Sequence, residues 1–414
     1  MAKVILKPRK ARPFWFGHPW VFSGAIDRVR GQAADGDVVD LLDDAGRLIG
    51  EGFWNSQSQI AVRVVALKGE GKLDAALLLK RLDLAITLRE DVLRLPEVTN
   101  AYRLVHSEGD GLPGLIVDRV GSVLVVQLSC LGMGQFMEPL VARLAERMAP
   151  SGIVERESRT AIDEEGMTRT GGVLFGTAPT GPMEVTEHGV TWLCDPMEGQ
   201  KTGWYSDQRE NRRFVAPFAR GREVLDAFSY VGGFGLPMAL AGATQVTCVD
   251  SSEPALDLAR RSASKAGMTE RMVFEKANVL RMLDHCAQEK RSFDVIVLDP
   301  PKFVHRRADI ERGLTLYHES NVKAFRVLRD GGVLFTHSCS QHVSDSAFDE
   351  MIAAAAKSVG VRAQEIYRGS QAPDHPVMLP LEEGRYLKSR GFRIQRSGMD
   401  IEIAPRIPQS NTEE

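Results

Sequence analysis

The feature that most constrains the fold of this 414-residue chain is a regular alternation of apolar strands and amphipathic helices that begins near Arg222. Such regularity is typical of a doubly wound, mostly parallel α/β sheet, so a Rossmann-like domain is predicted in the C-terminal half. The predicted strands are 224–228, 245–249, 272–275, 293–298 and 332–337, and the predicted helices are 233–241, 253–267, 279–289, 308–328 and 344–359.

The residues before this region indicate further domains, because 414 residues exceed what one hydrophobic core normally supports. Short alternating runs and turn signals up to about residue 70 are typical of a small β-barrel. Strands flanking a helix then indicate an α+β module, entered through a linker helix at 73–95 that Pro96 ends. The predicted domains are 1–71, 72–192 and 193–406, with a disordered tail at 407–414.

The first thirty residues carry seven Lys or Arg against one acid, which suits either a phosphate-facing patch or a solvated basic tail. The neighbouring stretch FWFGHPWVF is rich in aromatic residues, which stack on unpaired bases in some proteins and fill the cores of small barrels in others. Candidate RNA contacts are Lys7, Arg9, Lys10, Arg12, His18, Trp20 and, in the C-terminal half, Lys302.

The five cysteines are scattered without CxxC pairs, so neither a disulfide framework nor a metal site is expected. The N-terminus lacks the apolar run of a signal peptide, and no unbroken run of apolar residues approaches 18 residues. We therefore expect a cytoplasmic protein without a membrane partner.

The residues that end the first two predicted strands of the α/β region indicate which cofactor it binds. Asp226 closes the first strand before a glycine-rich turn, but Met238 occupies the third glycine position of a dinucleotide fingerprint. An acid there would repel a pyrophosphate and suits the cationic amino group of S-adenosylmethionine. Asp250 closes the second strand, where a carboxylate can accept hydrogen bonds from ribose hydroxyls. Together the two acids favour S-adenosylmethionine over NAD.

The predicted strand 293–298 is followed directly by Asp299. The next predicted strand, 332–337, is followed by a short segment that contains Cys339. Pro300 and Pro301 restrict the backbone at Asp299 and aim its side chain into the crevice. Consecutive strands joined by a right-handed helical crossover are usually neighbours, about 4.8 Å apart. Asp299 and Cys339 are therefore expected to flank one crevice, although a lone cysteine at a strand end is usually a small buried hydrophobe.

Seven stretches spread in order along the chain match one known family. They are GHPWVFSGAI (17–26), SEGDGLPGLIVDR (107–119), GWYSDQRENRR (203–213), DAFSYVGGFG (226–235), LDPPKF (298–303), FTHSCS (335–340) and DHPV (374–377). In these stretches the chain resembles the RlmI (YccW)-like bacterial ribosomal RNA methyltransferases, class I S-adenosylmethionine enzymes that form 5-methylcytosine in 23S rRNA. The resemblance implies an N-terminal PUA domain, a central α+β module and a Rossmann-like methyltransferase domain.

The resemblance also implies site residues, because the DQR element of the family enters the cofactor site. In this sequence Asn278 stands where an acid is expected near the adenine amine, and Gln341 stands where glycine is expected after SCS. The candidate cofactor contacts are Tyr205, Gln208, Arg209, Asp226, Phe228, Gly232, Gly233, Asp250, Asn278 and Asp299.

For catalysis we expect the Cys339 thiolate to add to cytosine carbon-6, with Asp299 facing the nitrogen-3 and amino edge. A free thiol is only a few per cent thiolate at neutral pH, so a nearby positive charge is expected: the sulfonium, Lys302 or His337. The target base must be single-stranded or flipped out, which fits an unfolded or single-stranded segment of 23S rRNA. A homodimer is left open.

Two other functions remain open. A [D/N]-P-P-aromatic turn serves amino-group methyltransferases on guanine or adenine, and DPPKF differs from it by one residue. A non-catalytic RNA-binding assembly factor would use the barrel alone. The second is less favoured, because the acids at the strand ends and Cys339 are all present.

Overall fold

The computed structural model describes residues 1–157, 162–163, 165–168 and 171–396, and the tail predicted at 407–414 lies outside them. The chain divides into two compact units. The first unit comprises residues 1–213 and the segment 371–385, and the second comprises residues 214–370 and the chain from Tyr386 onward. The chain therefore leaves the second unit after residue 370 and returns to it at Tyr386.

The N-terminal part of the first unit is a six-stranded sheet with the order β2-β6-β5-β4-β1-β3, in which β1 and β4 pair in parallel and the other pairs are antiparallel. The short helix α1 (Arg12–Trp15) buries Phe14 against this sheet. The strands are β1 (Ala2–Leu6), β2 (Trp20–Phe22), β3 (Ile26–Arg30), β4 (Val38–Leu42), β5 (Leu48–Trp54) and β6 (Ile60–Leu67).

The same unit contains a five-stranded sheet with the order β11-β10-β9-β8-β7, which packs with the helices α2 (Ala75–Thr87) and α3 (Met137–Met148) in one hydrophobic cluster. A two-stranded hairpin follows it. The strands are β7 (Ala101–His106), β8 (Leu115–Val120), β9 (Val123–Leu128), β10 (Gly152–Glu155), β11 (Gly172–Gly176) and, in the hairpin, β12 (Met183–Glu187) and β13 (Val190–Cys194).

The linker helix predicted at 73–95 is shorter in the structure. It begins at the Asp74 cap, whose carboxylate accepts a hydrogen bond from the Leu77 N–H, and continues past Thr87 as one π-helical turn, Leu88–Val92. Arg94 adopts a left-handed backbone with φ of 52°, which no helix can continue. The helix thus ends at Val92, four residues before Pro96.

The second unit is built on a seven-stranded sheet with the order β16-β15-β14-β17-β18-β20-β19. All neighbours are parallel except β20, which is antiparallel to both β18 and β19. The prediction of a mostly parallel α/β sheet is confirmed, and β19 and β20 were not predicted. The strands are β14 (Glu223–Ala227), β15 (Gln245–Asp250), β16 (Met272–Lys276), β17 (Phe293–Leu298), β18 (Leu328–Ser338), β19 (Val361–Gly369) and β20 (Lys388–Arg396).

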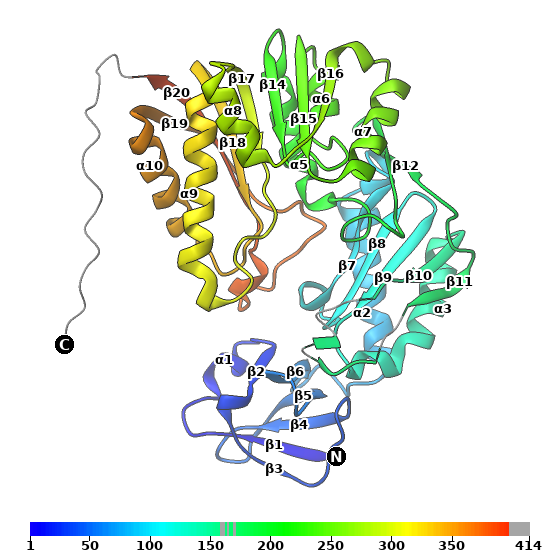
Figure 1. Cartoon of the computed structure of the whole chain (residues 1–414). Helices are drawn as coiled ribbons and strands as arrows, with labels where there is room; N and C mark the ends of the chain where they lie inside the picture. Colours follow the sequence, from blue (N-terminus) through cyan, green and yellow to red (C-terminus); the bar gives the residue numbers. More distant parts are fainter. Residues whose placement is uncertain (158–161, 164, 169–170, 397–414) are drawn as a thin grey trace, which may run out of the picture. The chain divides into compact units, whose positions relative to one another are not determined.

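Helices cover both faces of this sheet, as Figure 1 shows. Leu225 and Ala227 of β14 belong to one hydrophobic cluster with residues of α8, α9 and α10, whereas Gly235 of α6 approaches the other face at Cys248 and Val246. The helices are α6 (Gly235–Leu240), α7 (Glu253–Lys265), α8 (Val279–Gln288), α9 (Ile310–Val327) and α10 (Asp345–Val359).

The order of the strands reverses at β14, which lies between β15 and β17. Ligands of open α/β sheets bind beyond the carboxyl ends of the strands at such a switch point. The register pairs Ala227 with Leu298 and Leu298 with Thr336, so β14, β17 and β18 end side by side. Among the described residues, no helix is long and apolar enough to cross a membrane.

Candidate functional site

The turn after β14 has an unusual backbone. Phe228 and Tyr230 adopt left-handed conformations with φ of 64° and 49°, and Gly232 follows with φ of 74°. Left-handed backbone is costly for aromatic residues and persists where the surroundings enforce it. The end of β15 supplies that enforcement, because the Ser229 N–H donates to Val249 O (3.0 Å) and the Tyr230 N–H donates to Asp250 Oδ2 (2.9 Å).

Asp226 supports this turn from below. Its side chain is buried, and Oδ2 accepts a hydrogen bond of 2.7 Å from the Gly235 N–H at the start of α6. A Cβ at Gly235 would lie 2.6 Å from Cys248 Sγ, so glycine is required there for the helix to approach the sheet. One oxygen of Asp226 is therefore used to hold the turn and α6 in place.

Asp250 is half-buried at the end of β15, and its two oxygens accept from the N–H groups of Tyr230 and Ser252. A carboxylate has about four acceptor sites, so capacity for ribose hydroxyls remains. The Ser229 hydroxyl in the same turn is buried and lacks a hydrogen-bond partner among the described residues. Asn278 caps α8 by accepting from the Arg281 N–H (3.1 Å), and its side chain is exposed. These groups fit a nucleoside cofactor.

Asp299 lies directly after β17 and is half-buried. Its N–H donates to Ala227 O (3.3 Å), which ties the start of the DPPKF turn to β14. At the other end of the turn, the Val304 N–H donates to Ser340 Oγ (3.3 Å). The two strand ends that carry Asp299 and Cys339 are thus linked directly, as the sequence predicted from the crossover rule.

Cys339 follows β18 in a turn that its two serine neighbours fix. The Ser340 N–H donates to Ser338 Oγ (3.3 Å), and Ser340 Oγ is hydrogen-bonded to Tyr317 Oη of α9 (2.9 Å). Of the five cysteines only Cys339 is partly exposed, whereas Cys130, Cys194, Cys248 and Cys286 are buried. In the described part of the chain, no cluster of three or more His, Cys, Asp or Glu could hold a metal ion.

Lys302 and His337 were the side chains expected to supply a positive charge to the Cys339 thiol, and the structure removes one of them and adds another. His337 is fully buried, neither of its ring nitrogens has a hydrogen-bond partner among the described residues, and burial lowers its pKa to about 3. It is therefore neutral at neutral pH, and its proposed role as a cation is wrong. Lys302 is half-buried in the DPPKF turn. A lysine that the sequence gave no reason to select, Lys388, is buried and donates to Ser340 O (2.8 Å).

Tyr205, Gln208 and Arg209 lie in the first unit. The Arg209 guanidinium is fully buried and donates to both oxygens of Asp374, at 3.2 and 2.8 Å, and to Glu210. Gln208 Oε1 accepts from Asn211, and the Tyr205 hydroxyl donates to Gln200. In the structure Arg209 therefore holds the segment 371–385, and the contacts of these three residues with the cofactor stay predictions.

The stretch SEGDGLPGLIVDR (107–119) supplies three carboxylates to arginines that are buried or nearly so. Glu108 binds Arg63 (2.7 Å), Asp110 binds Arg89 (2.6 and 2.9 Å), and Asp118 binds Arg103 (2.5 Å).

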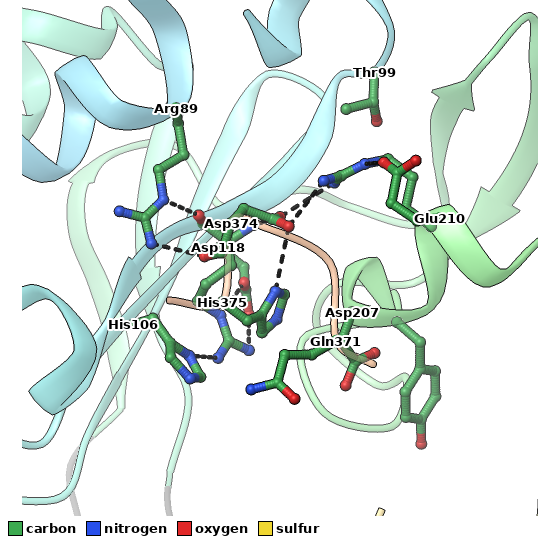
Figure 2. A network of polar contacts seen from close by, with 12 residues as sticks. Arg89, Thr99, His106, Asp118, Asp207, Glu210, Gln371, Asp374 and His375 are labelled. Atoms are coloured by element: carbon green, nitrogen blue, oxygen red, sulfur yellow. Dashed lines mark hydrogen bonds and ion pairs between the residues drawn. The ribbon is translucent and has the colours of Figure 1, made fainter. Parts of the chain in front are cut away.

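Figure 2 shows how the same network holds Asp374. Arg89 donates to its carbonyl oxygen (2.7 Å), and the Arg103 N–H donates to Oδ2 (2.9 Å). His375 follows, with its ring centroid 5.0 Å from that of His106. Burial and the positive neighbours hold the pKa of His106 well below its usual value.

The predicted RNA contacts on the N-terminal sheet divide into two groups. Lys7, Arg9, Lys10 and Arg12 are exposed, whereas Trp20 is half-buried and its Nε1–H donates to Glu108 (2.8 Å). His18 is also half-buried, and its Nδ1 accepts from the Trp20 N–H.

Different aromatic rings are exposed on this sheet. Phe16 and Trp15 are 71% and 40% exposed, with Arg12 over the first ring and Arg47 over the second, each at 5.9 Å. The sequence pattern marked the whole aromatic stretch and could not tell which rings point outward.

Comparison with known protein families gives two matches. Residues 4–66 match the PUA-like domain, and residues 159–356 match the S-adenosylmethionine-dependent methyltransferases. The predictions of a PUA-like domain, a methyltransferase domain and S-adenosylmethionine as cofactor are confirmed.

The chain also resembles named relatives over nearly its whole length. It is 38% identical to the ribosomal RNA large subunit methyltransferase I of Shewanella amazonensis, over 95% of this chain and 99% of that protein. It is 39% identical to the protein of the same name from Aeromonas salmonicida, over 91% of this chain and 96% of that protein.

Solved structures share the fold. A protein assigned to the S-adenosylmethionine-dependent methyltransferases, from Streptococcus mutans, superposes with a TM-score of 0.82 at 19% identity, over 95% of this chain and all of that chain. SMU.776, solved in complex with SAH, superposes with a TM-score of 0.83 over the same shares at 19% identity.

Proposed function

Since this chain belongs to the ribosomal RNA large subunit methyltransferase I family, we propose that it methylates carbon-5 of a cytosine in 23S rRNA, in the cytoplasm. The observation that carries the choice of atom is the placement of Cys339. It is the only partly exposed thiol of the five, and it follows the strand next to the one that ends at Asp299.

The carboxyl ends of β14, β15 and β17 form the cofactor site in this proposal. S-adenosylmethionine, when bound, supplies a methyl group made electrophilic by a positively charged sulfur. Asp250 accepts hydrogen bonds from the ribose hydroxyls, and Asn278 offers its amide near the adenine amine. The turn at Phe228, Gly232 and Gly233 provides the backbone surface, and Asp226 holds that turn in shape.

The reacting groups act on the cytosine ring. The Cys339 thiolate adds to carbon-6, which makes carbon-5 a nucleophilic enamine carbon able to accept the methyl group. Asp299 faces the nitrogen-3 and amino edge, where its carboxyl in the protonated form would donate to nitrogen-3 and offset the negative charge that develops there. Loss of the carbon-5 proton then breaks the bond between carbon-6 and sulfur and releases the thiolate.

The RNA contacts are proposed on the exposed face around α1. Trp15 and Phe16 offer rings for stacking on unpaired bases, and Arg12 and Arg47 beside them offer charge to phosphates. Trp20 and His18 instead support this face from within. We keep the proposed domain boundaries at 1–71, 72–192 and 193–406, and an unpaired or unfolded rRNA segment as the substrate.

One observation weighs against the rival amino-group chemistry. The [D/N]-P-P-aromatic turn of that chemistry has its aromatic residue directly after the second proline, a position that Lys302 holds here. Here the ring of Phe303 packs on Tyr317, with ring centroids 4.8 Å apart, and joins the hydrophobic cluster of the second unit. The aromatic residue of DPPKF is therefore used for packing, which favours a mechanism through the thiol.

The test is Cys339→Ser, with Cys286→Ser as the control at a buried thiol. Cys339→Ser should bind S-adenosylmethionine as the wild type does by calorimetry but lose methyl transfer to rRNA, measured by nucleoside mass spectrometry. RNA carrying 5-fluorocytidine should trap a covalent adduct on Cys339, because fluorine cannot leave as a proton does. Full activity of Cys339→Ser would remove the carbon-5 mechanism, and absence of cofactor binding in the wild type would favour an RNA-binding assembly factor.

A further inference from the structure

Lys388 lies at the start of β20, where the register places it opposite Ser338 of β18. Its side chain is 2% exposed. The Nζ atom donates to Ser340 O at 2.8 Å and to Tyr386 O at 3.1 Å. A buried ammonium group is thus attached to the backbone of the turn that carries Cys339.

Among the residues that the structure describes, this ammonium group has no carboxylate partner. No ion pair within 4.0 Å involves Lys388 in the described part of the chain, and its hydrogen bonds go to backbone carbonyls alone. The neighbouring Arg390 is paired with Asp345 and Asp349 of α10. Burying an unpaired charge is expensive, so a compensating negative charge is expected close to it.

The charged and titratable groups around Lys388 identify that compensating charge. Burial is the largest influence and lowers the pKa of Lys388 to about 8, with Arg390 and Lys302 acting in the same direction. Asp345 and Cys339 act in the opposite direction, and Asp345 is already bound to Arg390. Tyr317 is a further titratable group near Cys339, and burial raises its pKa, so it stays a neutral hydroxyl.

We propose that Lys388 is a positioning residue for Cys339: it holds the turn through Ser340 and supplies the positive charge that favours the thiolate. This inference rests on the proposed function, because it concerns the thiol that this function uses. A positive charge next to a cysteine shifts the thiol toward thiolate, and the thiolate is the nucleophile. His337 cannot take this role, since it is buried and neutral.

The experiment measures the alkylation of Cys339 by iodoacetamide as a function of pH in the full-length protein, read by peptide mass spectrometry. The other four cysteines are at most 3% exposed, so Cys339 reacts first in the folded protein. The wild-type midpoint should lie below the ordinary thiol value of about 8.5. Lys388→Met should raise the midpoint by about one pH unit, a tenfold loss of thiolate at neutral pH, and Lys388→Arg should preserve it.

Lys388→Met removes the charge and keeps an unbranched apolar chain, so folding is expected to survive, and S-adenosylmethionine binding verifies it. A merely structural role would change the limiting alkylation rate and leave the midpoint in place, which would overturn the proposal. Lys302→Met is the matched variant for the second lysine, and a midpoint shift in it alone would also overturn the proposal.

The outcome is separable from that of the proposed function, because thiol titration needs no RNA. A shifted midpoint in Lys388→Met together with a fully active Cys339→Ser would support the charge effect and refute the carbon-5 mechanism. An unchanged midpoint together with an inactive Cys339→Ser would do the reverse.

Discussion

Arg209 and Asp374 form a fully buried, doubly hydrogen-bonded ion pair across 165 residues of sequence, with both side chains 0% exposed. The pair joins the helix that starts at Arg209 to the segment 371–385, which the chain reaches only after six strands of the second unit. Arg89 donates to the backbone of the same aspartate. Removing this carboxylate therefore leaves a buried arginine without its partner.

Asp374→Asn should destabilise the first unit strongly, because breaking one side of a buried ion pair costs about 3–5 kcal/mol. Urea unfolding followed by tryptophan fluorescence measures the change. The control is Glu97→Gln, since Glu97 pairs with Arg94 on the surface at 57% and 67% exposure, where loss costs at most about 1 kcal/mol. Equal midpoints for the two variants would contradict the role given to Asp374.

We also expect Asp374 to make the stability of the folded protein sensitive to acid. Burial alone would raise the pKa of Asp374, but the charges and hydrogen bonds of His375 and Arg209 outweigh it and hold the pKa well below its usual range. A carboxyl with a depressed folded pKa contributes stability above its unfolded pKa of about 3.9 and loses it as the pH falls below that value. Asp374→Asn should therefore reduce the acid dependence of stability below about pH 4.

We expect His337 to cause a second loss of stability in acid, which begins at a higher pH than the loss caused by Asp374. Its folded pKa of about 3 lies below the unfolded value of about 6.5, so protons bind the unfolded chain first and stability falls as the pH drops from 6.5 toward 3. At pH 4.5 this amounts to about 2–3 kcal/mol. His337→Leu should remove that loss between pH 7.5 and 4.5, measured by urea unfolding at both values.

The control for this experiment is His305→Leu, because the His305 side chain is exposed. It should leave the wild-type pH dependence unchanged. If His337→Leu and the wild type lost the same stability on acidification, the buried neutral imidazole would not be the cause.

We expect the exposed aromatic residues near α1 to bind RNA and the half-buried Trp20 to contribute to stability. Trp15→Ala and Phe16→Ala should weaken RNA binding at constant salt, by about 5- to 150-fold, since stacking contributes about 1–3 kcal/mol per base. Phe175→Ala removes a ring on β11 whose exposure of 45% is close to the 40% of Trp15, and it should leave affinity unchanged. Filter binding to single-stranded rRNA fragments measures all three.

Trp20→Ala should act differently, because its Nε1–H is hydrogen-bonded to Glu108 in the first unit. We expect a loss of thermal stability with this variant. If Trp20→Ala reduced affinity without lowering stability while Trp15→Ala had no effect on either, the assignment of the stacking surface would be wrong.

Local pattern was sufficient to predict part of this structure. Apolar strands alternating with amphipathic helices predicted the parallel core of the sheet, and the crossover rule predicted that Asp299 and Cys339 end neighbouring strands. The strands β19 and β20 were missed because charged residues interrupt them and because the segment between them belongs to the other unit.

Contacts between distant parts of the sequence were beyond such reasoning. Local pattern could not show that the Trp20 Nε1–H donates to Glu108, 88 residues away. The ion pair of Arg209 with Asp374, 165 residues away, could not be predicted from local pattern either. Nothing in the local sequence marks Lys388 as a site residue, because only the antiparallel pairing of β20 with β18 brings it to Ser340.

The segment 371–385 also determines when, during translation, the first unit can be completed. Arg209 leaves the ribosome 165 residues before Asp374, roughly 8–33 s earlier at 5–20 residues per second. During that interval the growing chain holds two arginines, Arg89 and Arg209, whose burial depends on residues not yet synthesised. The N-terminal unit is thus translated first and completed late, and neither half of the gene encodes it alone.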